Sequence, residues 1–258
     1  MNKSVLNFLK SSLSFIYSTY FKSGYFRSAL FNKPCDSDGN PLPLLTYPFI
    51  EYIYDLDISN AKMLEFGGGN STLFFSSRVS EIYSIEPNFN NPNSWFSFLK
   101  EEISKSSNNE RIKLFGVNLP HPKKYEYYSD WVRIVNEKTK EVIDRILNKQ
   151  DTFDIVLIDG WGFQRNWIAK YLVNSLSKGG MIIVDNTYHC PQCAHSLREL
   201  GFNQINFKGH APSTHEDCTS IFFKGNIKFK PKSFRFPKNS FYRKKEFNPW
   251  EEDINFFN

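Results

Sequence analysis

The residue pattern with the clearest chemical meaning is a run of three glycines between an apolar segment and a polar one. Gly67, Gly68 and Gly69 follow the apolar run 62–66 and precede the polar residues 70–72. Glycines at a strand-to-helix turn let a ligand approach the backbone, and the N–H groups of a helix start have no partner within the helix. A turn that binds nothing needs fewer glycines. The run therefore predicts a ligand site, with an unliganded turn as the alternative.

Two acidic residues near the glycines narrow the choice of ligand. Glu65 stands two residues before the glycine run, and Glu86 ends a second apolar run at 81–86. A dinucleotide-binding turn would carry a further glycine where Thr72 stands, and a phosphate-binding P-loop would carry Gly-Lys-Ser/Thr, which the sequence lacks. Two carboxylates would repel a pyrophosphate, but they suit a ligand with a cationic amine and a ribose diol.

These features resemble the class I S-adenosylmethionine-dependent methyltransferases. Segment 64–69 is similar to their first motif, and Glu86 to the acid that binds the cofactor ribose. Segments 153–160 and 176–186 are similar to their fourth and fifth strands, so the resemblance covers roughly residues 40–224. It implies S-adenosylmethionine as the cofactor. The implied contacts with that cofactor are Glu65, Gly67, Gly68, Gly69, Asn70, Ser71, Thr72, Glu86, Asp159, Gly160 and Trp161.

A narrower similarity concerns the segments after the fourth and fifth strands. Asp159 and the pair Asp185-Asn186 resemble the metal ligands of the catechol and caffeoyl-type O-methyltransferases. The resemblance implies Mg²⁺, since carboxylate and amide oxygens are hard ligands. Those enzymes carry a lysine base soon after the first Asp, whereas residues 162–164 contain no lysine and Arg165 cannot be deprotonated. A metal-free acid/base pair, or a cap on the strand end, is therefore the alternative.

Histidines and cysteines after the fifth strand offer further chemistry. His189 follows that strand closely, and an imidazole there is a reasonable general base for an acceptor hydroxyl. His210 and His215 are weaker candidates, and a solvated loop histidine is the alternative for each. Cys190 and Cys193 form a single Cys-x-x-Cys pair, which falls short of a zinc knuckle and favours ordinary thiols. The predicted catalytic residues are Asp159, Asp185 and His189.

Alternating strands and helices must hold these residues in place. Such alternation is typical of an α/β fold with a doubly wound, mostly parallel sheet. The last two strands are separated only by a loop, 209–217, so we expect an antiparallel edge. This agrees with the Rossmann-like, seven-stranded methyltransferase fold that the resemblance implies. The predicted strands are 62–66, 81–86, 111–117, 153–158, 180–185, 203–208 and 218–224, with helices at 71–79, 131–148, 165–177 and 192–200.

The two ends of the chain differ from this core. We expect an N-terminal helix with a Pro-rich connection over the cofactor site (1–48), a catalytic domain (49–224) and a basic aromatic tail (225–258). The apolar stripe of the helix is predicted to pack on the domain or on a second, identical subunit, with docking on a membrane surface as the alternative. The tail holds nine Lys/Arg and no acid between 224 and 245. We favour a strap packed on the body or on a partner subunit over an arm for single-stranded nucleic acid, because residues 1–223 carry no net charge.

Composition excludes several classes of protein. The 258 residues are 40% hydrophobic and 23% charged, which excludes a disordered or collagen-like chain. No apolar run approaches the ~18 residues that cross a bilayer. Four cysteines without a secretory signal predict a reducing, cytoplasmic compartment.

The function predicted from these observations is methyl transfer to an oxygen of a small-molecule or glycan-like acceptor, a sugar or a nucleotide-linked group. Nucleic-acid amino-methyltransferases carry Asp/Asn-Pro-Pro-Tyr/Phe after strand four, where this chain has Asp159-Gly160-Trp161, so nucleic acid is disfavoured. Aminopropyl-transferring polyamine synthases prefer an acid where Asn70 stands. The alternatives are a protein of this fold that binds without catalysis, or a transferase acting on another acceptor class.

Overall fold

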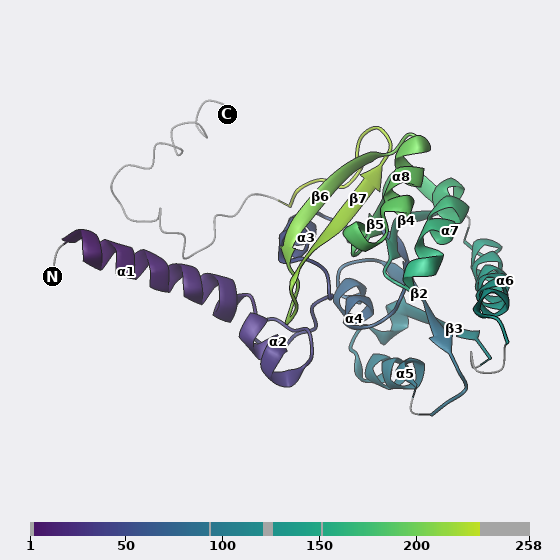
Figure 1. Cartoon of the computed structure of the whole chain (residues 1–258), viewed down its shortest axis with the longest axis horizontal. Helices are drawn as coiled ribbons and strands as arrows, with labels where there is room; N and C mark the ends of the chain where they lie inside the picture. The colour runs from purple at the N-terminus through teal and green to yellow at the C-terminus, as the bar shows by residue number, and fades with distance from the viewer. Residues whose placement is uncertain (1–2, 93, 121–125, 151, 233–258) are drawn as a thin grey trace.

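A seven-stranded sheet forms the centre of the computed structural model, which describes residues 3–92, 94–120, 126–150 and 152–232 (Figure 1). The strand order is β3-β2-β1-β4-β5-β7-β6. The first five strands in this order are parallel, and β7 is antiparallel to both of its neighbours. This confirms the predicted fold class, including the antiparallel edge. The strands are β1 Lys62–Phe66, β2 Glu81–Asn88, β3 Ile112–Asn118, β4 Phe153–Ile158, β5 Leu176–Val184, β6 Asn203–His210 and β7 Glu216–Phe223.

Helices cover both faces of the sheet, with α3, α4 and α5 on one face and α6, α7 and α8 on the other (Figure 1). Successive side chains of a strand point to opposite faces. In β1, Met63 therefore packs in one core with Phe74 of α4, whereas Leu64 packs in the other with Val135 of α6. The helices are α1 Lys3–Ile16, α2 Tyr25–Phe31, α3 Tyr47–Asp55, α4 Asn70–Ser76, α5 Trp95–Lys105, α6 Tyr128–Leu147, α7 Gly162–Leu172 and α8 Pro191–Glu199.

The register of the parallel strands brings the polar residues after them to one edge of the sheet. Phe66, the last residue of β1, pairs with Ile85 of β2 and with Ile158 of β4. Ile158 in turn pairs with Val184 of β5. The next residue in each strand, or directly after it, is Gly67, Glu86, Asp159 or Asp185. Four of the residues singled out from the sequence thus lie at the same level of the sheet, where ligands bind in folds of this kind.

The N-terminal helix α1 projects away from the sheet and its covering helices (Figure 1). Large apolar side chains along it, among them Leu6, Leu9 and Leu13, are exposed. The described residues therefore do not show the predicted packing of this stripe on the domain. Packing on a second subunit, or docking on a membrane surface, stays a prediction. No helix in the described part of the chain is long and apolar enough to cross a membrane.

The first residues of the predicted tail lie along the body. The backbone N–H of Lys228 donates to the carbonyl of Gly179, and the backbone N–H of Asp57 donates to the carbonyl of Lys230. The Lys228 ammonium pairs with the Asp154 carboxylate, and Phe229 packs against the core beneath α3 and α4. Residues 233–258 of the predicted tail lie outside the described residues.

Candidate functional site

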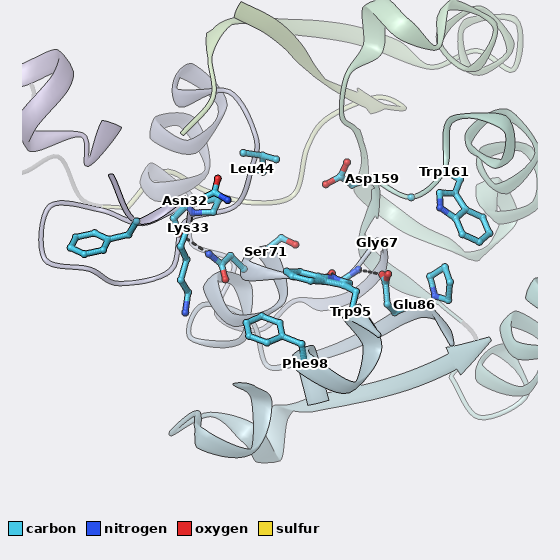
Figure 2. Close-up of a pocket in the computed structure, with 17 residues that line it drawn as sticks. Asn32, Lys33, Leu44, Gly67, Ser71, Glu86, Trp95, Phe98, Asp159 and Trp161 are labelled. Atoms are coloured by element: carbon cyan, nitrogen blue, oxygen red, sulfur yellow. Dashed lines mark hydrogen bonds between the residues drawn. The ribbon is translucent and has the colours of Figure 1, made fainter. Parts of the chain in front are cut away.

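A cavity of about 670 Å³ opens at the edge of the sheet where β1, β2 and β4 end (Figure 2). Its volume falls within the range of small-molecule and cofactor sites. In Figure 2, Asn32, Lys33 and Leu44 lie on one side of it, and Glu86 and Trp161 on the opposite side. The predicted cofactor contacts that line it are Gly67, Gly68, Gly69, Asn70, Ser71, Glu86, Asp159, Gly160 and Trp161.

The glycine turn is packed tightly against its surroundings at two of its three positions. Gly67 has φ +88°, and a Cβ there would lie 2.7 Å from the main chain of Asp159. A Cβ on Gly68 would lie 2.4 Å from the Ser84 hydroxyl. A Cβ on Gly69 would lie 3.4 Å from the Trp95 ring, an ordinary contact. The first two glycines are therefore required by packing, and Gly69 is the position where a side chain would enter the cavity instead.

Glu65 and Thr72 were predicted to contact the cofactor, and the structure corrects this assignment. Both side chains are completely buried and do not line the cavity. The Thr72 hydroxyl donates to the Glu65 carboxylate and accepts from the backbone N–H of Gly69 at 3.0 Å. Ser84 Oγ donates to the same carboxylate at 2.7 Å, and burial raises the pKa of Glu65. Glu65 points from β1 into the core rather than into the cavity. Through Thr72, which accepts the Gly69 N–H, it supports the glycine turn from inside the protein.

Glu86 lines the cavity and lies in β2, one residue beyond its last pair with β1. Its Oε2 accepts a hydrogen bond from the backbone N–H of Gly68 at 2.8 Å. Burial raises the pKa of Glu86 to about 8, and the Gly68 N–H lowers it only in part. A buried carboxyl with a single donor has acceptor capacity left for a ligand, since an ionised carboxylate offers about four lone-pair sites.

Arg165, from the first turn of α7, is the centre of the polar network at the ends of β4 and β5. Its side chain is nearly buried, and its Nε donates to the carbonyl of Gly160 at 2.9 Å. Nη1 donates to the carbonyl of Asp185. Nη2 lies 3.3 Å from Asp159 Oδ1 and 3.1 Å from Asn186 Oδ1. A permanent cation thus lies between two of the three oxygens that were predicted to bind Mg²⁺.

The donor set Asp159, Asp185 and Asn186 does not fit a divalent cation in this arrangement. The Arg165 guanidinium would repel a second cation at Asp159 and Asn186. The Asp185 carboxylate is turned to Thr219, whose hydroxyl donates to Oδ1 at 2.7 Å. The predicted Mg²⁺ site is therefore not formed, because α7 supplies the positive charge itself.

The two carboxyl groups of this network have raised pKa values. Burial and the neighbouring Asp185 raise the pKa of Asp159, against the lowering effect of Arg165. Burial raises the pKa of Asp185 to about 6, while the Thr219 hydroxyl lowers it. Asp159 lines the cavity, but Asp185 is buried behind it and does not. Of these two predicted catalytic residues, only Asp159 is placed to meet a ligand.

His189, the third predicted catalytic residue, lies outside the 670 Å³ cavity. It belongs to the short helical turn Thr187–His189, with its ring exposed beside Asp217, and lines a separate hollow of about 320 Å³. Cys190 and Cys193 are buried free thiols whose pKa values burial raises. Among the described residues, they join no cluster of three or more metal ligands, so a zinc knuckle does not form.

Several residues of the cavity wall carry no sequence motif and were missed. The Trp95 indole N–H donates to the carbonyl of Gly68 at 2.7 Å, which fixes the ring over the glycine turn. The Asn70 amide donates to the carbonyl of Pro34 at 2.7 Å and so attaches the N-terminal segment to α4. Residues 31–34 form the wall on that side. The one signal in the sequence for Trp95 is that it stands at the start of α5, the helix that follows Glu86 along the chain.

Comparison with protein-family models and with curated protein sequences gives no match. Comparison with solved structures gives many. The O-methyltransferase from Bacillus cereus in complex with SAH superimposes with a TM-score of 0.51 at 15% identity, covering 82% of this chain and 96% of that chain. Cofactor-bound Rv0187 from MTB gives a TM-score of 0.50 at 14% identity, covering 81% and 94%. The chain has the class I S-adenosylmethionine-dependent methyltransferase fold. In this methyltransferase fold the cavity, the glycine turn and Glu86 occupy the carboxyl edge of the sheet.

Proposed function

We propose that this chain is an S-adenosylmethionine-dependent methyltransferase that acts on an oxygen of a small-molecule or glycan-like acceptor. One observation carries the proposal. The 670 Å³ cavity combines a glycine turn without room for side chains at Gly67 and Gly68 with two carboxyl groups, Glu86 and Asp159, from the strands on either side of β1. That combination offers carboxyl oxygens that can accept hydrogen bonds from a ribose diol.

The residues of the cavity fit the proposed cofactor. Glu86 has free acceptor capacity for the ribose hydroxyls, and it lies next to the aromatic rings of Trp95 and Trp161. A flat base can pack on such rings. Asp159 lines the same cavity, with its carboxylate paired to Arg165. When bound, S-adenosylmethionine supplies a methyl group on a positively charged sulfur.

The chain's own contribution to the reaction would be alignment and proton removal. An acceptor hydroxyl must lose its proton as its oxygen forms the new bond to carbon. We assign the proton to a carboxylate oxygen of Asp159, because burial and Asp185 raise the pKa of Asp159 and so make it a stronger base. Arg165 is a positioning residue, since its Nη2 donates to Asp159 Oδ1 at 3.3 Å. Tight positioning of this kind supplies much of the rate in transfers that need no covalent help.

Isothermal titration with S-adenosylmethionine, followed by a methyl-release assay, tests the proposal. We expect saturable one-to-one binding, and methylated products in a mass-shift screen of cell metabolites. Binding without any product would favour the non-catalytic alternative. Mass shifts confined to amines, or transfer of an aminopropyl group, would favour another acceptor class. A folded protein that does not bind the cofactor would refute the proposed function.

A further inference from the structure

Two histidines and an aspartate meet at a place that the proposed cofactor site does not use. His189 comes from the turn after β5, His215 from the loop between β6 and β7, and Asp217 from the start of β7. Their ligand atoms all lie within 4.8 Å of one another. The residues are far apart in sequence, so the antiparallel pairing of β7 with β5 is what brings them together.

Asp217 is held rigidly in this cluster. Its Oδ1 accepts from the backbone N–H of Cys218 at 2.7 Å, and its Oδ2 accepts from the Asn186 amide at 2.8 Å. His189 Nε2 lies 3.8 Å from the same Oδ2. The Asp217 side chain is only 9% exposed, and within the described ranges the one group paired with its charge is His189, with no lysine or arginine at salt-bridge distance. A nearly buried carboxylate without a permanent cation favours binding of a positive ion.

The two histidines leave the cluster open to solvent. The His189 side chain is 71% exposed, and His215 is exposed as well. Metal sites that bind exogenous ligands have three protein ligands and a free coordination position, whereas structural sites are closed. Asn186 fixes the carboxylate through its amide and is itself fixed by Arg165, an outer shell of the kind that orients metal ligands.

We propose that His189, His215 and Asp217 bind a divalent transition-metal ion of the zinc class, with its remaining coordination positions open. Two imidazoles and one carboxylate suit Zn²⁺, Co²⁺, Ni²⁺ or Fe²⁺, and they suit Mg²⁺ poorly because it prefers oxygen ligands. The site is distinct from Asp159, Asp185 and Asn186, where Arg165 already supplies the positive charge. A role of this ion in holding an acceptor oxygen would rest on the proposed function, whereas the binding itself does not.

Zinc binding to the full chain tests the proposal without any activity assay. The chain is freed of metal with a chelator, and Zn²⁺ is titrated in competition with a chromogenic chelator. We expect one equivalent to bind. His215→Ala, whose exposed side chain can be removed without disturbing the core, should weaken the affinity at least about tenfold, as should His189→Ala. Asp217→Asn should do the same if circular dichroism shows that it folds.

His195→Ala is the matched control, because His195 is also an exposed histidine beside a carboxylate, 3.1 Å from Glu199. It should leave the affinity unchanged. The absorption spectrum of the Co²⁺-loaded chain should lack thiolate charge-transfer bands, which separates this site from Cys190 and Cys193. Failure of the unaltered chain to bind one equivalent, equal weakening by His195→Ala, or thiolate bands would each overturn the proposal. None of these results affects the titration with S-adenosylmethionine, so the two proposals fail separately.

Discussion

Glu86 Oε2 accepts a hydrogen bond from the backbone N–H of Gly68 at 2.8 Å, which joins β2 to the glycine turn that follows β1. The relationship places a carboxyl group at the cavity surface with only one protein donor. Burial outweighs that donor and raises the pKa of Glu86 from 4.5 to about 8. At neutral pH the free protein therefore holds Glu86 mostly as the neutral acid.

Cofactor affinity should depend on pH through Glu86. Ribose hydroxyls that donate to Glu86 favour its ionised form, so binding must release the proton that the free protein holds below pH about 8. We expect the dissociation constant for S-adenosylmethionine to rise up to about tenfold per pH unit below that value. Isothermal titration in buffers of different ionisation enthalpy measures the released proton. Glu86→Gln should bind ~1–3 kcal/mol more weakly, with a flat pH profile. A pH-dependent affinity in Glu86→Gln would assign the proton elsewhere.

The same shift affects the stability of the protein without ligand. The folded state binds a proton at Glu86 more tightly than the unfolded state, whose pKa is near 4.5. The contribution of this group is fully present below pH 4.5 and is lost as the pH rises through about 8. The free energy of unfolding from urea titrations should thus decrease over this interval, and less so in Glu86→Gln.

Gly69→Ala should weaken cofactor binding without unfolding the protein. Gly69 has an extended backbone that any residue can adopt, and its new Cβ would lie 3.4 Å from Trp95, on the cavity side of the turn. We expect the affinity for S-adenosylmethionine to fall at least about tenfold, since the methyl group takes space that the ligand needs. Gly162→Ala is the control and should bind normally, because the added carbon would meet no side chain or other segment within 4 Å apart from its own chain neighbours. Equal affinities in the two variants would place the ligand away from the turn. Gly67→Val is unsuitable because it clashes with the main chain of Asp159.

Arg165→Met should destabilise the protein in a pH-dependent way. The substitution removes the cation between Asp159 and Asn186, and breaking a buried pair by removing one partner costs about 3–5 kcal/mol. Asp185 has a pKa of about 6 in the presence of Arg165, and without the guanidinium that pKa rises further. The loss should therefore be smaller at pH 5.5, where the Asp185 carboxyl group is mostly protonated, than at pH 8. Urea titrations of the variant at both values, with Lys170→Met as a control on the exposed side of α7, measure it. A loss independent of pH would mean that Arg165 acts through packing alone.

Asp159→Asn should reduce turnover more than it reduces cofactor affinity. The amide preserves an oxygen that can accept from Arg165, but it cannot take a proton from the acceptor. Loss of a general base typically lowers kcat by about 10²–10⁴-fold. Asp185→Asn is the comparison, since Asp185 is buried behind the cavity and should change kcat much less. If both variants, or neither, lose turnover on an acceptor from the mass-shift screen, Asp159 is not the base.

The strands, and the position of the polar residues at one edge of the sheet, could be predicted from the sequence. Both follow from short-range patterns. Apolar runs bounded by turn residues predicted all seven strands, and the pairing of Phe66 with Ile85 and Ile158 then places Gly67, Glu86 and Asp159 together. Register in a parallel sheet is set by these buried runs, so the residue after each run lies at a predictable place.

The role of Arg165 could not be predicted in the same way. The sequence shows only that an arginine stands where a related site has a lysine base. Its function as a cation among the carbonyls of Asp159, Gly160 and Asp185 depends on how α7 packs on the sheet. The wall formed by Trp95 and residues 31–34 likewise depends on where α5 and the N-terminal segment lie. Side-chain contacts between elements follow from packing angles that no local pattern specifies.

A chain that ends at Gly225 should melt at a lower temperature than the full chain. It loses the Lys228–Asp154 ion pair, the backbone bonds of Lys228 and Lys230, and the apolar contacts of Phe229 with the core. Losing even ~1 kcal/mol lowers the melting temperature of a domain this size by about 2–4 °C. A chain that ends at Lys232 keeps all of these contacts and should melt like the full chain, since residues 226–232 hold the described part of the strap.

If both truncated chains melt like the full chain but lose a salt-dependent affinity for single-stranded nucleic acid, the tail is a nucleic-acid arm. The strap is favoured because Phe229 already covers apolar surface that a free arm would leave in water.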